Sequence, residues 1–160
     1  MGYAERATVR RVREALEAKG VEPEIVELDS TARSAREAVE ALGVLVKQIV
    51  KSLVFRASES GRPVLVVASV PNRVDEHGIS GILGEPIEKA SADFVREKTG
   101  YSIGGVPPVG HTEVPVVFMD EALLHEDEVW AAAGHTHAVF PLTPEELVRI
   151  TGGRVVPVGG

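Results

Sequence analysis

The sequence contains no cysteine among its 160 residues. This absence excludes disulfide bonds, a thiolate nucleophile and any metal site built on cysteine. Aromatic residues make up only 4% of the chain, which argues against a surface on which single-stranded bases stack. No uninterrupted apolar run reaches the roughly 18 residues that a membrane-spanning helix needs. The first residues also lack the apolar core of a secretory signal, so we expect a cytoplasmic protein.

Positive charge is scarce as well. The 17 lysine and arginine residues are outnumbered by 24 acidic residues, which gives a formal net charge of −7. Because contacts of Lys and Arg with phosphates supply most of the affinity for nucleic acids, this balance disfavours extensive duplex binding. A local contact with the tip of a nucleic acid stays open. What the chain does have is an ordinary globular composition, 44% hydrophobic, and a length that suits one domain, residues 1–160.

Helices are indicated by apolar spacing and by capping residues. Val9, Val12 and Leu16 recur at helical intervals, and Gly20 is a suitable helix end. Between residues 70 and 84 two glycines interrupt any helical pattern. The predicted helices cover residues 4–19, 34–42, 92–99 and 144–151.

The first predicted helix carries a second stripe, formed by Arg6, Arg10 and Arg13. We interpret it as a solvated face whose arginines pair with Glu14 and Glu17. The alternative is a contact with nucleic-acid phosphates.

Strands are predicted between these helices, and two pairs of them form hairpins. Residues 48–57 and 63–69 flank a turn that contains Gly61, and residues 128–133 and 138–142 flank a turn at 134–137. The other predicted strands are 24–28, 86–90, 114–119 and 154–158. The mixture of strands and helices predicts an α/β fold, with a mixed sheet and peripheral helices.

Lys51 is unusual for its position in a predicted strand. Strand alternation places it on one face with Ile49, Leu53 and Phe55. Lysine is rarely buried without a partner. Either its stem crosses apolar surface and its ammonium reaches water, or it is a cation in a cleft that binds an anionic or carbonyl oxygen.

A glycine- and proline-rich segment, residues 104–110, is followed by His111. Glycines allow a close approach of the backbone to a ligand, and exposed amides in such a loop could stabilise developing negative charge on a carbonyl oxygen. The alternative is a tight connection between a helix and a strand.

Other catalytic chemistries find little support. His111, His135 and His137 could ligate a metal together with Asp120, but their spacing matches no known zinc motif. No G-x-S-x-G elbow, P-loop or dinucleotide-binding motif is present. We therefore expect no metal and no cofactor.

Seven segments together resemble the YbaK/EbsC family, which is related to the editing domain of bacterial prolyl-tRNA synthetases. In order they are STARS at 30–34, ALG at 41–43, QIVKSLVF at 48–55, KTGYSIGGVPPVG at 98–110, FMDEAL at 118–123, AAG at 132–134 and LTPEEL at 142–147. The order and spacing of these segments, more than any one of them, make the resemblance specific.

The resemblance implies a compact fold around a mixed, barrel-like sheet. It also implies deacylation of mischarged tRNA, most often a proline tRNA that carries Cys or Ala. The partners would be the aminoacylated acceptor end of the tRNA, with prolyl-tRNA synthetase as a further candidate; a monomer and a homodimer are both open. Pro107 stands where the family commonly has Ser, so the amino acid removed is also open.

Matching the segments residue by residue gives a candidate site. Lys51 would bind the terminal adenosine, amides around Gly105 and Gly110 would hold the ester carbonyl, and His111 would orient a water or a ribose hydroxyl, unless its role is structural. The further substrate-binding candidates are Ser30, Ser52, Gly104, Pro107, Asp120 and Gly134. Two other functions are kept as alternatives, a non-catalytic tRNA-binding module of the same fold and a metal-dependent hydrolase that uses the histidines.

Overall fold

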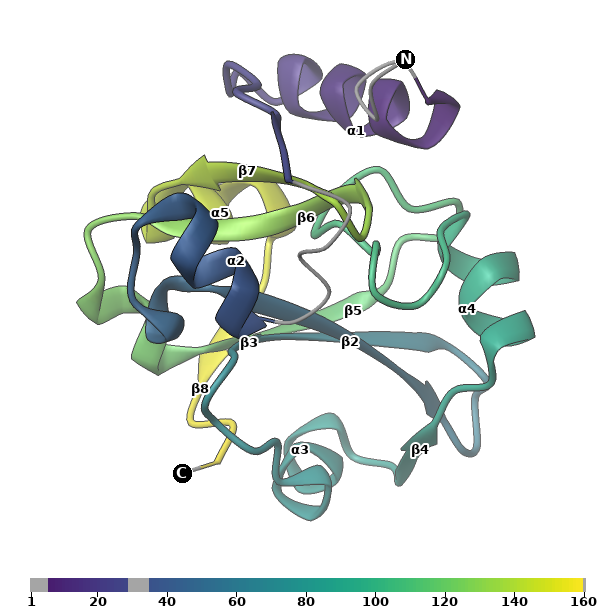
Figure 1. Ribbon diagram of the computed structural model, residues 1–160. Coiled ribbons are helices and arrows are strands. Elements are labelled where there is room, and N and C mark those ends of the chain that lie inside the picture. Colours follow the sequence, from purple (N-terminus) through teal and green to yellow (C-terminus); the bar gives the residue numbers. More distant parts are fainter. Residues whose placement is uncertain (1–5, 29–34, 160) are drawn as a thin grey trace.

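The computed structural model describes residues 6–28 and 35–159, so that Ser30 lies outside the described residues (Figure 1). The helices are α1 (Ala7–Ala18), α2 (Ala35–Leu42), α3 (Glu76–Leu83), α4 (Ala92–Thr99) and α5 (Pro144–Thr151), with two short 3₁₀ helices, η2 (Val46–Gln48) and η3 (Glu121–His125). The strands are β1 (Val26–Glu27), β2 (Val50–Ala57), β3 (Pro63–Ser69), β4 (Ile87–Lys89), β5 (Val116–Asp120), β6 (Val129–His135), β7 (Ala138–Leu142) and β8 (Arg154–Val156).

The strands form two sheets. One is mixed and has the order β4-β2-β3-β5-β8, and the other is antiparallel and has the order β1-β7-β6. A single bridge between Ile49 and Trp130 connects β6 to the start of β2. The α/β class with a mixed sheet and peripheral helices is confirmed, but the described strands do not close into a barrel.

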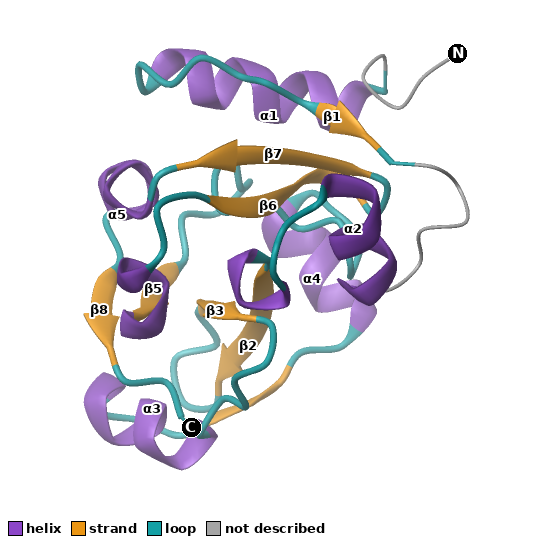
Figure 2. Ribbon diagram, turned by 60° about the vertical axis from the view of Figure 1, so that its left-hand side comes forward, coloured by secondary structure: helices purple, strands orange, loops and turns teal. Residues whose placement is uncertain are grey.

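The core lies mainly between the two sheets. Val9, Val12 and Leu16 of α1 pack into it, and Figure 2 shows α1 lying across β6 and β7. A second apolar cluster on the other face of the mixed sheet includes Ile79 of α3 and Phe118 of β5. Every residue of β3 is buried because the strand has neighbours on both edges and apolar layers on both faces.

Capping residues fix two helices where the sequence predicts them. The Ser91 hydroxyl accepts a hydrogen bond from the Phe94 amide at the start of α4. Thr143 and Glu146 form a reciprocal capping box at the start of α5. Both helices end at a glycine with positive φ, as expected for a helix C-terminus.

One expectation about helices is wrong, and another is wrong in part. Helix α3 forms although Gly78 and Gly81 lie within it, because Asp75 caps its first turn and Ile79 is buried. On α1, no ion pair links Arg10 or Arg13 to Glu14 or Glu17, all four of which the structure describes.

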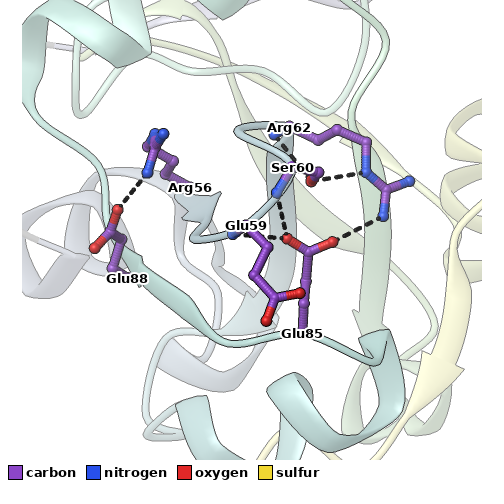
Figure 3. Close-up of polar contacts among 6 residues, drawn as sticks. All are labelled: Arg56, Glu59, Ser60, Arg62, Glu85 and Glu88. Atoms are coloured by element: carbon purple, nitrogen blue, oxygen red, sulfur yellow. Dashed lines mark hydrogen bonds and ion pairs between the residues drawn. The ribbon is translucent and has the colours of Figure 1, made fainter.

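The far end of the β2–β3 hairpin is held by a carboxylate from outside it. Figure 3 shows Glu85, which follows α3, accepting hydrogen bonds from the amides of Glu59 and Ser60 at 3.1 and 2.8 Å and lying 3.6 Å from the Arg62 guanidinium. Beside it, Arg56 and Glu88 form an ion pair between β2 and β4 at 2.7 Å. These contacts join the turn to the loop before β4.

Candidate active site

The first half of β2 has an open edge. Strand β4 pairs only with Phe55–Ala57, so residues 51–54 have β3 on one side and no described strand on the other. A cleft of about 740 Å³ follows this edge and is lined by every residue from 49 to 55. Figure 1 shows that β4 lies beside the far end of β2 and not beside its first half.

The direction of the backbone groups along this edge follows from the hairpin. Ala57 donates its amide hydrogen to the Arg62 carbonyl, and the Ile49 carbonyl accepts from the Val70 amide, so these residues direct their groups toward β3. Alternation along a regular antiparallel strand then directs the backbone N–H and C=O of Ser52 and Val54 to the open edge. The cleft therefore has main-chain donors and acceptors along one wall.

The other walls come from segments far apart in the sequence. They are the loop before α3, the C-terminal end of β4, the start of the glycine-rich segment, and the β6–β7 hairpin. Their lining side chains are mostly apolar, including Val74, Ile103, Val106, Trp130 and Val139. Such a lining, with a few polar groups, is typical of a small-molecule site.

Lys51 lines this cleft. Its side chain lies on the face of β2 that alternation predicts, the face from which Leu53 and Phe55 pack into the second apolar cluster. Its ammonium donates to the Asn72 carbonyl at 2.5 Å. Burial lowers the pKa of Lys51, and the Asp120 carboxylate partly opposes that shift. The cation is therefore held against one wall of the cleft.

Asp120 lies beneath that wall and does not line the cleft. Its side chain is buried and accepts hydrogen bonds from the Ser69 amide at 3.1 Å, the Asn72 side-chain amide at 2.9 Å and the Ala122 amide at 2.9 Å. The backbone carbonyl of Asn72 in turn accepts the hydrogen bond from the Lys51 ammonium. The structure thus places Asp120 as a support for the loop that positions Lys51.

Two further polar groups occur in the cleft lining. The Ser52 hydroxyl and the Trp130 indole N–H are both buried, and neither has a hydrogen-bond partner among the described residues. Buried polar atoms are usually paired, so groups of this kind are candidates for contact with a ligand or a bound water. Trp130 was missed by the sequence reasoning, although alternation with the buried Val129 and Ala131 in a predicted strand could have found it.

The glycine-rich segment lines the cleft at Gly104 and Val106. Gly104 has φ +92°, and a Cβ there would lie 2.8 Å from the Thr136 methyl group. Gly105 is buried, does not line the cleft, and donates its amide hydrogen to the Ser102 carbonyl at 3.0 Å. A Cβ on Gly105 would lie 3.0 Å from the Cα and the amide nitrogen of His135. The Gly105 amide is therefore engaged in a hydrogen bond within its own loop.

The remaining sequence candidates lie away from the cleft. His111 Nε2 donates to the carbonyl of the buried Pro107 at 2.6 Å, and burial lowers the His111 pKa although this hydrogen bond opposes the shift. Gly110 and His111 line a separate cavity of about 150 Å³, and Tyr101 donates its hydroxyl hydrogen to the Gly110 carbonyl.

Gly134 lies at a contact between elements. A Cβ at its φ of +94° would lie 2.8 Å from the Thr8 carbonyl oxygen of α1. The structure therefore brings Lys51, Ser52 and Gly104 to one cleft, and it places Pro107, Gly110, His111, Asp120 and Gly134 outside that cleft's lining.

The charge of the cleft differs in sign from that of the chain. Lys51, Arg73 and Lys89 line it together with a single described carboxylate, Glu76. The ion pairs found among the described residues engage other cations, namely Lys47, Arg56, Arg62, Arg96 and Lys98. The cleft lining therefore carries more positive than negative charge, and none of its three cations is in an ion pair with another described residue.

No group of three or more potential metal ligands occurs in residues 6–28 and 35–159. Over the same ranges, no helix combines the length and the apolar character needed to cross a membrane.

Comparison with known proteins gives consistent matches. Residues 29–150 match the sequence model of the aminoacyl-tRNA editing domain family. The uncharacterized protein YwhH of Bacillus subtilis (strain 168) is 30% identical over 134 residues, which cover 84% of this chain and 85% of YwhH.

Two solved structures are similar over nearly their whole length. One is described as "a putative trans-editing enzyme for prolyl tRNA synthetase" and has a TM-score of 0.92 and 44% identity, covering 97% of this chain and 98% of its own. The other, hypothetical protein APE2540, has a TM-score of 0.85 and 32% identity, covering 94% and 99%.

Proposed function

The chain belongs to the aminoacyl-tRNA editing domain family, and from this we propose that it is a freestanding enzyme that hydrolyses a wrongly attached amino acid from the 3′ end of a tRNA. We propose a proline tRNA carrying Cys or Ala as the substrate, a choice supported by the similar structure described for prolyl-tRNA synthetase. Charged tRNA is a cytoplasmic substrate, so we place the reaction there.

The charge of the cleft is the observation that carries this proposal. Three cations without carboxylate partners line a cleft in a chain of net charge −7. A cleft of this charge attracts phosphate groups. The rest of the chain is acidic and disfavours a long contact with a nucleic acid. A substrate that inserts only its anionic tip fits this distribution. Lys51 would bind the terminal nucleotide.

The chemistry demands little of the protein because an aminoacyl ester is already activated. A water attacks the ester carbonyl carbon, the carbonyl oxygen becomes negatively charged, and the bond to the ribose oxygen breaks as that oxygen takes up the proton released by the water. Free amino acid and uncharged tRNA result. The protein must orient the ester and stabilise the oxyanion.

We assign the oxyanion contact to Ser52. Its backbone N–H faces the open edge of β2, next to Lys51, and its hydroxyl lacks a partner among the described residues. The Gly105 amide, which the sequence suggested for this role, is engaged by Ser102. The apolar lining of the cleft would hold the small acyl side chain.

The test is deacylation of tRNAs charged separately with Cys, Ala, Ser, Thr and Pro. We expect hydrolysis of at least one mischarged proline tRNA, and we expect Lys51→Ala to lower kcat/KM by roughly 100-fold or more because a partly buried charge contact is lost. Lys47→Ala is the matched control, since Lys47 pairs with Glu126 and does not line the cleft.

Other outcomes would favour the alternatives. If charged tRNA binds but no ester is cleaved, the protein is a binding module. If activity disappears in excess chelator and zinc restores it, the protein is a metal-dependent hydrolase.

A further inference from the structure

Glu76 is the one carboxylate among the described residues that line the cleft. Its side chain is half-buried, and no hydrogen bond or ion pair to its carboxylate occurs within the described part of the chain. Three cations line the same cleft, but none of them lies within ion-pair distance of the Glu76 carboxylate. The Glu76 carboxylate is therefore available to bind a cationic group of a ligand.

The backbone that carries Glu76 is firmly held. Asp75 caps α3 by accepting from the Gly78 amide at 3.1 Å, and its own amide donates to the Val158 carbonyl at 2.6 Å. The Glu76 carbonyl accepts from the Ser80 hydroxyl at 2.7 Å. A fixed negative charge is thus presented at the cleft.

This charge lies on the same wall as Lys51. The Lys51 ammonium is bonded to the carbonyl of Asn72, and Arg73 and Val74, between Asn72 and Glu76, also line the cleft. One short segment thus presents cations and, a few residues later, a carboxylate. A ligand that carries negative charge and, a short distance away, one positive charge complements this wall.

We infer that Glu76 binds the α-ammonium group of the aminoacyl ester. This inference rests on the proposed function, whose substrate is a polyanion with a single cation next to the reacting carbonyl. Binding that cation would orient the carbonyl carbon toward the open edge of β2. It would also select a free amino acid ester over one whose amine is acylated, because an amide carries no charge.

The competing explanation is that Glu76 only stabilises the first turn of α3. Glu145 provides a matched control, since it occupies the first turn of α5, is exposed and does not line the cleft. A role confined to the helix would make Glu76→Gln and Glu145→Gln alike in every binding measurement. A role in ammonium binding would separate them.

The experiment measures binding of a non-hydrolysable probe, 3′-deoxy-3′-(alanylamino)adenosine 5′-phosphate, and of its N-acetyl derivative. Titration calorimetry at about pH 6.5 keeps the free amine mostly protonated. We expect the wild type and Glu145→Gln to prefer the free amine by roughly tenfold or more, as for one charge-assisted hydrogen bond. Glu76→Gln should bind both probes with similar affinity, and circular dichroism should show its fold unchanged.

Equal binding of the two probes by the wild type would overturn the inference, as would a preference that survives in Glu76→Gln. The deacylation assay decides the proposed function separately. If the wild type cleaves charged tRNA but binds the free and N-acetyl probes equally, the proposed function stands and the ammonium-binding role of Glu76 is wrong.

Discussion

Gly105 is a residue whose missing side chain lets two backbone segments approach closely. Its amide is already bonded to Ser102, and a Cβ would lie 3.0 Å from the His135 backbone. We expect Gly105→Ala to lower the free energy of unfolding by about 1–3 kcal/mol, because the loop and the β6–β7 turn must separate. Urea denaturation measures this change.

Gly81→Ala is the control for that substitution. Gly81 lies in α3 with no neighbouring atom within 4 Å of the added methyl group. Alanine there should stabilise the protein by about 0.4–1 kcal/mol. If Gly105→Ala instead keeps full stability and loses about 10²–10³ in kcat, the amide at 105 does stabilise the oxyanion.

Single residues of the site were predictable where strand alternation determines the answer. Alternation predicts that Lys51 shares a face of β2 with Leu53 and Phe55, and it does, although the cleft follows the open edge and is lined from both faces of the strand. Alternation cannot report the direction of a loop amide or an imidazole, which depends on tertiary hydrogen bonds such as those of Gly105 and His111. Arg73 and Glu76 left no signal in the sequence, because their wall faces β2 only after folding.

At the scale of elements, helix ends were predictable where a local side chain caps them. Ser91 and Thr143 are followed by helices with the expected bounds. Helix α3 was missed because glycine lowers helix propensity, while the compensation comes from Asp75 and from burial of Ile79. The open edge of β2 was also unpredictable, since it depends on how short β4 is.

The Glu85 contact with the β2–β3 turn should make stability depend on pH. Hydrogen bonds from the Ser60 amide first, then from the Ser60 hydroxyl and the Glu59 amide, together with Arg62, lower the Glu85 pKa. A carboxyl group with a lowered folded pKa adds stability above its unfolded pKa, about 4.3, and loses it as the pH falls through the folded pKa. Glu85→Gln should therefore be less stable than the wild type at neutral pH, with the difference shrinking in acid.

Urea midpoints at about pH 7 and pH 3.5, on either side of the unfolded pKa, measure this difference. Glu88→Gln is the control, because Glu88 makes one exposed ion pair with Arg56, and such pairs contribute little. A Glu85→Gln deficit that is equally large at both pH values would show that the turn depends on the shape of the side chain and not on its charge.

For the whole molecule, the arrangement of charge matters more than its sum. The net charge of −7 predicts weak attraction to nucleic acid, and that reasoning could not locate the cleft cations because they come from β2, β4 and the loop before α3. Five other cations are neutralised locally by ion pairs. The lining of the cleft is therefore one place where a tRNA meets positive charge that is not engaged in an ion pair.

The salt dependence of tRNA binding tests this arrangement. Each phosphate neutralised on a single strand contributes a slope of roughly −0.7 to the log–log plot of affinity against salt. Three contacts, from Lys51, Arg73 and Lys89, predict a slope of about −2, measured by fluorescence anisotropy with a labelled tRNA. Arg73→Ala should make the slope shallower by about 0.7, and Lys47→Ala should leave it unchanged because Lys47 already pairs with Glu126. A slope near about −6 would require an extended interface outside the cleft. Arg10 and Arg13 on α1, which make no ion pair with Glu14 or Glu17, would then be the first residues to replace.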